Sequence, residues 1–264
     1  MISKEHIDPE YKNFLIASNE KTHFKSLWNR NDPWFEEPNL GRRDSKKAWS
    51  GVSKIVCDGH AFFLKKQENY FTYSVRPPFR QLIVQKEYTN IQLFKSLKIP
   101  CLDVVYFGIR KQEGKTQGIL ITKSLENYIS LHDIQLQRKK SHGSEQFRIK
   151  RAVIEKIAAL VKKTHKSGLM HRCLYPKHIY VEKDFYKTGE QQTKEPVCRF
   201  IDLESARKAS YNSKKQLRDL ETLNRRLPAL HFKDKVYFLL QYLNKTNTDN
   251  DVRDMIKRIK DISR

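Results

Sequence analysis

Two short stretches of the chain combine histidines and carboxylates with strand-like apolar residues. In HRCLYPKH, His171 and His178 flank a proline-containing loop that leads into a short strand. In FIDLE, Asp202 comes directly after two apolar residues, and Glu204 is a weaker second acid. A carboxylate at the end of a buried strand can hold a hard cation such as Mg²⁺. These stretches therefore indicate a metal site of the kind that phosphoryl transfer requires.

A lysine and a glutamate further upstream could serve the phosphates of a nucleotide. Lys65 ends the apolar run FFLK, so its ammonium would project from a buried surface and would need a counter-charge. Glu87 lies beside the apolar stripe of the helix expected over 79–100 and could supply that charge. Taken alone, the two residues are more simply interpreted as ordinary surface charges.

The first part of the chain reads as strands around one helix. Asp58-Gly59 is a hairpin turn between two strands in the segment 49–73. After the helix, apolar runs predict strands at 103–108 and 117–125. Residues 1–48 give no clear pattern, and we expect their aromatic residues and the one that follows to anchor packing: Trp28, Trp34, Phe35 and Trp49.

The second part is richer in helix. Ser144 is a candidate N-cap for a long helix that carries His165 on its apolar stripe and ends at Gly168. A polar hairpin tip is expected at 184–196. Three more helices are expected, at 217–227, 236–243 and 251–262. Asp219 lies at the start of the first of these, where we expect it to accept hydrogen bonds from the loop backbone.

A β-rich half followed by a helix-rich half predicts an α+β fold of two lobes with a cleft between them. The expected boundaries are 1–125 for the β-rich N-terminal lobe, with 1–48 as an unassigned extension, and 126–264 for the helical C-terminal lobe.

Five segments in order carry a family resemblance: FFLKK, KEYTNIQLFKSLKIP, HRCLYPKHIYV, FIDLESAR and LRDLETLNRR. The chain resembles the bacterial lipopolysaccharide core kinase family, which contains heptose and Kdo kinases and InaA-like proteins and is itself similar to protein kinases. The resemblance covers roughly residues 49–228, and five degenerate matches in the correct order are far more specific than any one of them. It implies a protein kinase-like fold, ATP and Mg²⁺ as cofactors, and a lipopolysaccharide core or other anionic glycolipid as acceptor.

The resemblance also implies roles for individual residues. Lys65 becomes the phosphate-binding lysine, with Lys66 as the alternative if the match is shifted by one, and Glu87 becomes its helix partner. His178 and Asp202 become the metal ligands. The loop that covers the nucleotide is poorly matched, because the segment WSGVSK offers only Gly51.

His171 and Arg172 then begin the catalytic loop, and Cys173 stands where active kinases carry the aspartate that accepts the hydroxyl proton. A thiol, with an ordinary pKa of ~8.5, is a poor substitute at neutral pH. Cys173 is either a partial thiolate, if Arg172 or His171 lowers its pKa, or a small buried residue that fills space. A zinc cluster of His165, His171, Cys173 and His178 fits no common ligand spacing.

The net charge of +22, from 52 basic and 30 acidic residues, predicts attraction to polyanions. Nucleic acid is an unlikely partner because no recognition motif is present, whereas peripheral association with an anionic membrane face suits a diffuse basic surface. The N-terminus has no signal-like apolar segment, no apolar run reaches the ~20 residues of a membrane span, and the four cysteines form no C-x-x-C pair. We expect a cytoplasmic protein, peripheral at the inner membrane at most.

Three functions remain open at this point. The chain is an ATP-dependent kinase that phosphorylates a heptose or Kdo of the lipopolysaccharide inner core, or a regulatory pseudokinase that lacks the catalytic aspartate, or a polyanion-binding protein on a kinase-like fold. Cys173 separates the first two, and the third rests on charge alone.

Overall fold

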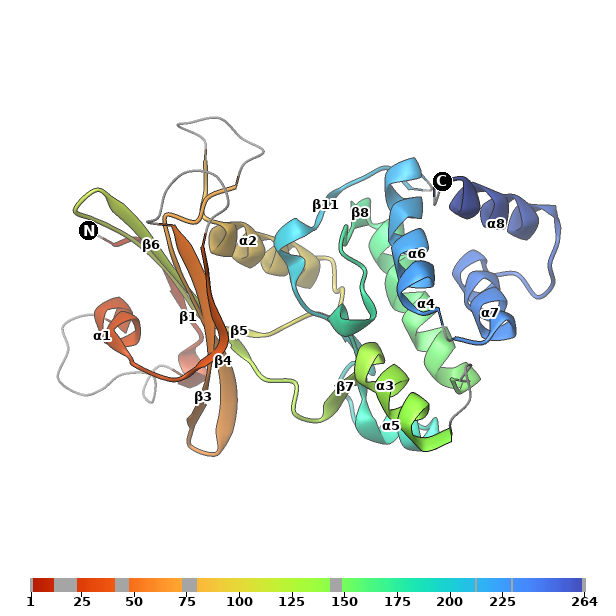
Figure 1. The fold of residues 1–264 in the computed structure, drawn as a ribbon, viewed down its shortest axis with the longest axis horizontal. Helices are drawn as coiled ribbons and strands as arrows, with labels where there is room; N and C mark the ends of the chain where they lie inside the picture. The colour runs from red at the N-terminus through yellow and green to blue at the C-terminus, as the bar shows by residue number, and fades with distance from the viewer. Residues whose placement is uncertain are drawn as a thin grey trace. The chain divides into compact units, whose positions relative to one another are not determined.

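The computed structural model describes residues 2–11, 23–40, 48–72, 80–142, 149–211, 213–228 and 230–262. The chain divides into two compact units (Figure 1). The first unit comprises Met1–Gln92 and Leu102–Ser124, and the second comprises Leu93–Cys101 and Leu125–Arg264.

The first unit is built on one antiparallel sheet of six strands in the order β1-β5-β6-β4-β3-β2. The strands are β1 (Ile2–Ile7), β2 (Trp34–Leu40), β3 (Trp49–Cys57), β4 (His60–Glu68), β5 (Val104–Gln112) and β6 (Lys115–Lys123). Asp58 and Gly59 join β3 to β4 with φ of 47° and 75°, as a two-residue hairpin requires. The expected strands and their connecting helix are therefore confirmed, but β1 and β2 arise from the segment that gave no clear pattern.

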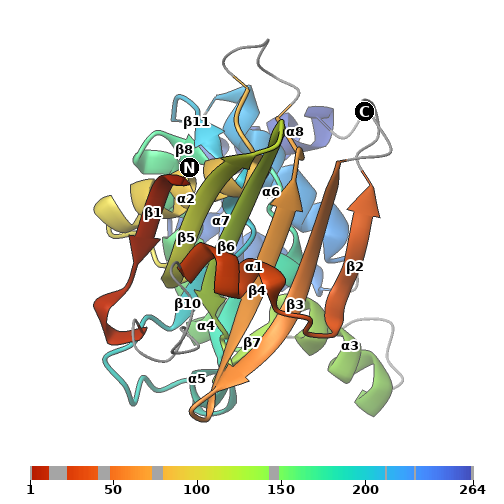
Figure 2. The same cartoon turned by 90° about the vertical axis from the view of Figure 1, so that its left-hand side faces the viewer.

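Helices lie on both faces of this sheet. Helix α1 (His23–Asn29) crosses one face and buries Phe24 and Leu27 in the core (Figure 2). Helix α2 (Ile83–Ser96) lies against the other face, where the backbone N–H of Val84 donates to Gln67 Oε1 at 2.7 Å. Because side chains alternate along β4, neighbouring residues of that strand reach different helices.

The second unit is mainly helical, with two small sheets. Its helices are α3 (Leu131–His142), α4 (Arg151–Lys166), α5 (Lys183–Thr188), α6 (Lys214–Arg226), α7 (Phe232–Leu243) and α8 (Asn250–Ile262). Strands β7 (Tyr128–Ser130), β9 (Ile179–Glu182) and β10 (Cys198–Phe200) form one sheet, and β8 (Leu169–Met170) pairs with β11 (Arg207–Lys208). Helix α4 packs on α7, and α6 packs on α8.

Helix α4 forms where the apolar stripe predicts it, and Gly168 just beyond its end has a φ of +72° that suits glycine. The proposed N-cap, Ser144, lies outside the described residues, and α4 itself begins at Arg151. The expected hairpin tip at 184–196 was wrong in part, because α5 occupies its first residues and ends at Gly189 in the left-handed region.

Candidate active site

Lys65 and Glu87 form an ion pair within the first unit. Lys65 Nζ, on β4, donates to Glu87 Oε2, on α2, at 2.8 Å, and the two side chains are 20% and 7% exposed. The sequence provides both positions: Lys65 follows an apolar strand segment, and Glu87 lies one turn into the helix that packs on that strand. The Lys65 side chain is thus not fully buried, as a residue that binds phosphate requires.

Lys66 and Gly51, the other two residues of the β3–β4 hairpin that were expected near the nucleotide, have different surroundings from Lys65. Lys66, on the opposite face of β4, is buried and donates to the carbonyl oxygens of Trp28 and Arg30 at 2.9 and 2.7 Å. Gly51, expected in the loop that covers the nucleotide, lies within strand β3, and its role toward a nucleotide stays a prediction. A Cβ there would lie 2.7 Å from the Trp34 ring, so packing alone explains the glycine.

In the second unit, the loop 171–178 is fixed by one buried carboxylate. Asp219, on α6, accepts hydrogen bonds from the backbone N–H groups of His171 and Arg172 at 2.7 and 2.8 Å, as the sequence predicts. Arg172 has a φ of +70°, an uncommon conformation for a side-chain-bearing residue, which these bonds hold in place. The loop therefore has a single defined shape, and the Arg172 side chain is exposed.

The same loop presents His178 to Asp202. His178 Nδ1 donates to the Cys173 carbonyl at 2.8 Å, and Nε2 lies 3.1 Å from Asp202 Oδ2. Strand pairing positions the two residues, because the Ile201 N–H donates to the His178 carbonyl at 3.1 Å. Asp202 itself adopts a left-handed conformation, with φ of 57°.

This arrangement fits a divalent cation. Since Nδ1 donates to a carbonyl, a neutral His178 turns the lone pair of Nε2 toward a carboxylate oxygen, which also needs a positive partner. Burial lowers the pKa of His178, against the attraction of Asp202, and so disfavours a proton on Nε2. Neighbouring ligands of an octahedral Mg²⁺ ion at ~2.1 Å lie about 3 Å apart, which matches the observed pair. Nucleotide phosphates and water would complete such a site.

His171 and Cys173 lie beside this pair but are not arranged for proton transfer. His171 is buried, its Nε2 donates to the Ile201 carbonyl at 3.0 Å, and burial lowers its pKa. Burial, with the neighbouring carboxylates of Asp202 and Glu204, raises the pKa of the Cys173 thiol despite a hydrogen bond with Ser205. These influences favour the protonated thiol at Cys173 over a partial thiolate.

His165, which lies on helix α4, is part of the core. His165 Nδ1 lies 2.8 Å from the Tyr242 hydroxyl and Nε2 lies 3.3 Å from Asp219 Oδ2, so both ring nitrogens have protein partners. Within the part of the chain that the structure describes, no group of three or more His, Cys, Asp or Glu side chains is placed to hold a metal. A metal ion in the second unit would thus be held by His178, Asp202 and oxygen atoms of the bound nucleotide and water.

Comparison with known proteins decides the relationship. Residues 25–257 match the lipopolysaccharide kinase (Kdo/WaaP) family, which is most of the chain. The chain belongs to this family. The match includes Lys65, Glu87, His178 and Asp202, and it confirms the family resemblance of the five segments.

Two curated relatives and one solved structure agree with this membership. Protein InaA of Escherichia coli strain K12 is 26% identical over 213 residues, which is 81% of this chain and 92% of InaA. The lipopolysaccharide core heptose(I) kinase WaaP of Escherichia coli is 26% identical over 180 residues, 65% of this chain and 66% of WaaP. A structure of WaaP in complex with acyl carrier protein matches with a TM-score of 0.62 and 15% identity, covering 99% of this chain and all of that one. The kinase-like α+β fold is thereby confirmed.

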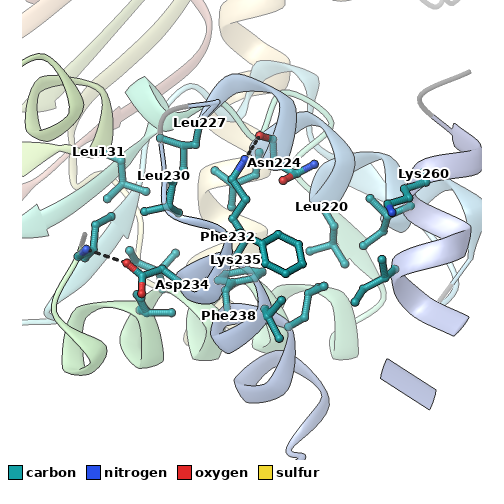
Figure 3. A pocket seen from close by; sticks show the side chains of 18 residues that line it. Leu131, Leu220, Asn224, Leu227, Leu230, Phe232, Asp234, Lys235, Phe238 and Lys260 are labelled. Carbon is teal, nitrogen blue, oxygen red and sulfur yellow. Dashed lines mark hydrogen bonds between the residues drawn. The ribbon is translucent and has the colours of Figure 1, made fainter. Parts of the chain in front are cut away.

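This family member also has an apolar pocket in its second unit that the sequence did not predict. The pocket has a volume of about 330 Å³ and lies among α4, α6, α7 and α8 (Figure 3). Leu220, Phe232 and Phe238 line it, with the Lys235 and Lys260 side chains beside them. Asp234 is buried next to it and accepts a hydrogen bond from the Ile149 N–H at 3.2 Å.

The sequence predicts a helix at 236–243, which forms part of α7, but it gives no sign of the pocket that this helix lines. In the structure Tyr242 is fully buried, while most of the preceding residues of α7 are only half-buried. No described helix is long and apolar enough to cross a membrane.

Proposed function

We propose that the chain is a phosphotransferase that uses ATP and Mg²⁺ to phosphorylate a heptose or Kdo hydroxyl of the lipopolysaccharide inner core. The observation that carries this proposal is the His178–Asp202 pair: His178 lies on a loop held by the buried carboxylate of Asp219, and its Nε2 is 3.1 Å from Asp202 Oδ2. Family membership supports the reaction class and the acceptor.

Each residue would act mainly by position and charge. Mg²⁺, when bound, would neutralise charge on the transferred phosphoryl group. His178 and Asp202 would hold it, and Asp219 would keep their loop in one conformation. Lys65, oriented by Glu87, would bind the nucleotide phosphates. Phe63 lies two residues before Lys65 on the same face of β4, with its ring 5.2 Å from that of the 62% exposed Phe35, so this face also offers aromatic surface to a base.

The thiol at Cys173 limits the rate that this machinery can reach. A neutral thiol cannot accept the proton of the attacking hydroxyl, and general-base help is worth roughly 10²–10⁴-fold. Because the transition state is loose, positioning and charge neutralisation carry most of the acceleration. We therefore propose a slow kinase. Cys173 also favours the second candidate, a pseudokinase that keeps the fold and nucleotide binding without transfer.

The deciding experiment is transfer of labelled phosphate from ATP to purified lipopolysaccharide core at high protein concentration. The proposal expects Mg²⁺-dependent incorporation that is lost in Asp202→Asn. Nucleotide binding without incorporation would establish the pseudokinase instead. Binding of polyanions in general, steeply salt-dependent and unchanged in Lys65→Ala, would support the polyanion-binding alternative.

The pocket supports a further partner. One relative's structure is that of WaaP in complex with acyl carrier protein. We propose that the pocket of this chain accepts an acyl chain delivered by such a carrier, since its 330 Å³ lies within the range of about 300–1,000 Å³ for small-molecule pockets and its lining is apolar. The net charge of +22 would separately favour peripheral association with an anionic membrane face on the cytoplasmic side.

A thermal-stability comparison tests the acyl partner. Acyl carrier protein with a long acyl chain should stabilise the protein more than the same carrier with a bare pantetheine arm. Leu239→Trp, which fills the pocket, should remove that difference. Equal effects of the two carriers on the wild-type protein would contradict the proposal.

A further inference from the structure

Arg226, in the last turn of α6, lies over an aromatic ring of the candidate catalytic loop. Its guanidinium carbon is 5.2 Å from the centre of the Tyr175 ring, and the Tyr175 ring centre is 5.3 Å from that of His178. Tyr175 stands between Cys173 and the metal-ligand position in the loop. The Arg226 guanidinium thus contacts Tyr175, which in turn contacts His178 of the His178–Asp202 pair. All four residues belong to the second unit.

The neighbouring arginine shows what an ordinary arrangement on this helix is. Arg225 Nε donates to Glu221 Oε1 at 2.7 Å, an i,i+4 pair of the common surface kind. Among the described residues, no carboxylate lies within ion-pair distance of Arg226. The helix dipole favours cations here, but it does so equally for both arginines and does not account for the contact with Tyr175.

A guanidinium on an aromatic face keeps its hydrogen-bonding edge available. Arg presents five N–H donors in a planar fork that matches phosphate and carboxylate oxygens. The aromatic ring limits the orientations of the long side chain, so less freedom is lost when a ligand binds. Two more exposed cations, Arg172 and Lys177, lie on the loop itself.

The site also needs such a cation. Asp202, 3.1 Å from His178, and Glu204, two residues further along the chain, bring negative charge to this region. A ligand that arrives with a phosphate or carboxylate group would meet this charge as well. A fixed cation beside the metal ligands offsets that repulsion and orients the group.

We propose that Arg226, supported by Tyr175, binds the phosphate or carboxylate group of a ligand beside the His178–Asp202 pair. The inference rests on the proposed function, since it deepens the same site. Two sources carry this chemistry: the terminal phosphates of the nucleotide and an anionic group of the acceptor. Arg226 binds and orients the group and takes no part in a covalent step.

Calorimetric binding of two ligands distinguishes the sources. The ligands are Mg·ATP and a lipopolysaccharide core oligosaccharide that contains Kdo. Arg226→Ala should raise the dissociation constant for one of them by about tenfold or more, because a charge-assisted hydrogen bond is lost. Arg225→Ala, the matched control one residue away, should leave both constants near the wild-type values. Tyr175→Leu should raise the dissociation constant for the same ligand as Arg226→Ala does, whereas Tyr175→Phe should leave that constant unchanged.

Inorganic pyrophosphate provides a probe that needs neither activity nor the natural ligands. The Nε–H signal of Arg226 in an NMR titration should shift with pyrophosphate, and more than that of Arg225. A wild-type protein that binds neither Mg·ATP nor the oligosaccharide would refute the proposed function, and the pyrophosphate titration would still decide this inference. Equal effects of Arg226→Ala and Arg225→Ala on every probe would overturn it.

Discussion

His178 Nε2 and Asp202 Oδ2 face each other at 3.1 Å, while His178 Nδ1 is committed to the Cys173 carbonyl. With the histidine neutral, both facing atoms carry lone pairs, and only a proton or a metal ion can make their contact favourable. Burial acts against the proton by lowering the pKa of His178. This geometry is the basis of the proposal that a metal ion joins the two side chains.

Asp202→Asn should abolish the Mg²⁺-dependent part of stabilisation by ATP. The amide is nearly the same size as the carboxylate but lacks its charge, so the metal is held much less tightly. Thermal unfolding with ATP, measured with Mg²⁺ and with EDTA, reports this directly. Asp184→Asn, an exposed carboxylate of α5, is the control and should keep the full Mg²⁺ effect. An unchanged Mg²⁺ effect in Asp202→Asn would remove Asp202 from the metal site.

The two adjacent lysines of β4 should behave in opposite ways. Lys65→Met should weaken ATP binding by roughly 10–100-fold, the value of a charge-assisted hydrogen bond. Lys66→Met should destabilise the protein by about 1–3 kcal/mol, because the carbonyls of Trp28 and Arg30 lose a buried donor. Calorimetry with ATP and denaturant unfolding measure the two effects. If Lys66→Met instead weakened ATP binding and Lys65→Met did not, the lysine that binds the nucleotide would be Lys66.

Sequence patterns were sufficient to predict a residue's place when that place depends only on the helix or strand that contains the residue. Asp219 was expected to accept hydrogen bonds from the loop backbone as an acid at the start of a helix; the acceptor role is confirmed, but α6 begins earlier, at Lys214, so Asp219 lies inside the helix. Lys65 and Glu87 lie on a strand and a helix that each show clear periodicity, but the family resemblance was needed to select them over ordinary surface charges. In each case the structure brings together residues that the sequence had already singled out.

Features that depend on distant residues were not predictable. Gly51 has a packing role because Trp34, from another strand, occupies the space of its side chain. Strand β2 contains Glu36, Glu37 and Pro38 and lies at the sheet edge, where exposed residues give no alternation. The pocket and the Arg226–Tyr175 contact require several helices and a loop to pack, and no single segment encodes them.

Asp219→Ala should destabilise the second unit by about 2–4 kcal/mol. The substitution removes the acceptor of two backbone N–H groups, and that of His171 is buried. Asp219→Asn should cost less, since its carbonyl oxygen can still accept one of them. Denaturant unfolding gives both values, with exposed Asp184→Ala as the neutral reference. If Asp219→Ala were as stable as that reference, the loop would have to be held by other contacts.

Cys173 should react slowly with alkylating reagents at neutral pH. The thiolate is the reactive form, and because burial raises the thiol pKa above its ordinary value, the thiolate fraction at pH 7.5 is smaller than for a free cysteine. Labelling by iodoacetamide, followed residue by residue with mass spectrometry, should accelerate as the pH rises past the ordinary thiol pKa. Reaction at pH 7.5 as fast as that of free cysteine would indicate an activated thiolate.

Cys173→Asp should increase phosphoryl transfer by up to roughly 10²–10⁴-fold, the usual contribution of a general base. The loop is already in place, since Asp219 fixes its backbone and the Cys173 carbonyl accepts from His178. The new carboxylate would thus occupy a prepared position, although its proximity to Asp202 and Glu204 adds repulsion that bound Mg²⁺ would relieve. Initial rates with saturating ATP and core oligosaccharide measure the gain. Cys173→Ser, which supplies no base, should match the wild type, and equal rates for the Asp and Ser variants would mean that proton acceptance at residue 173 does not limit the reaction.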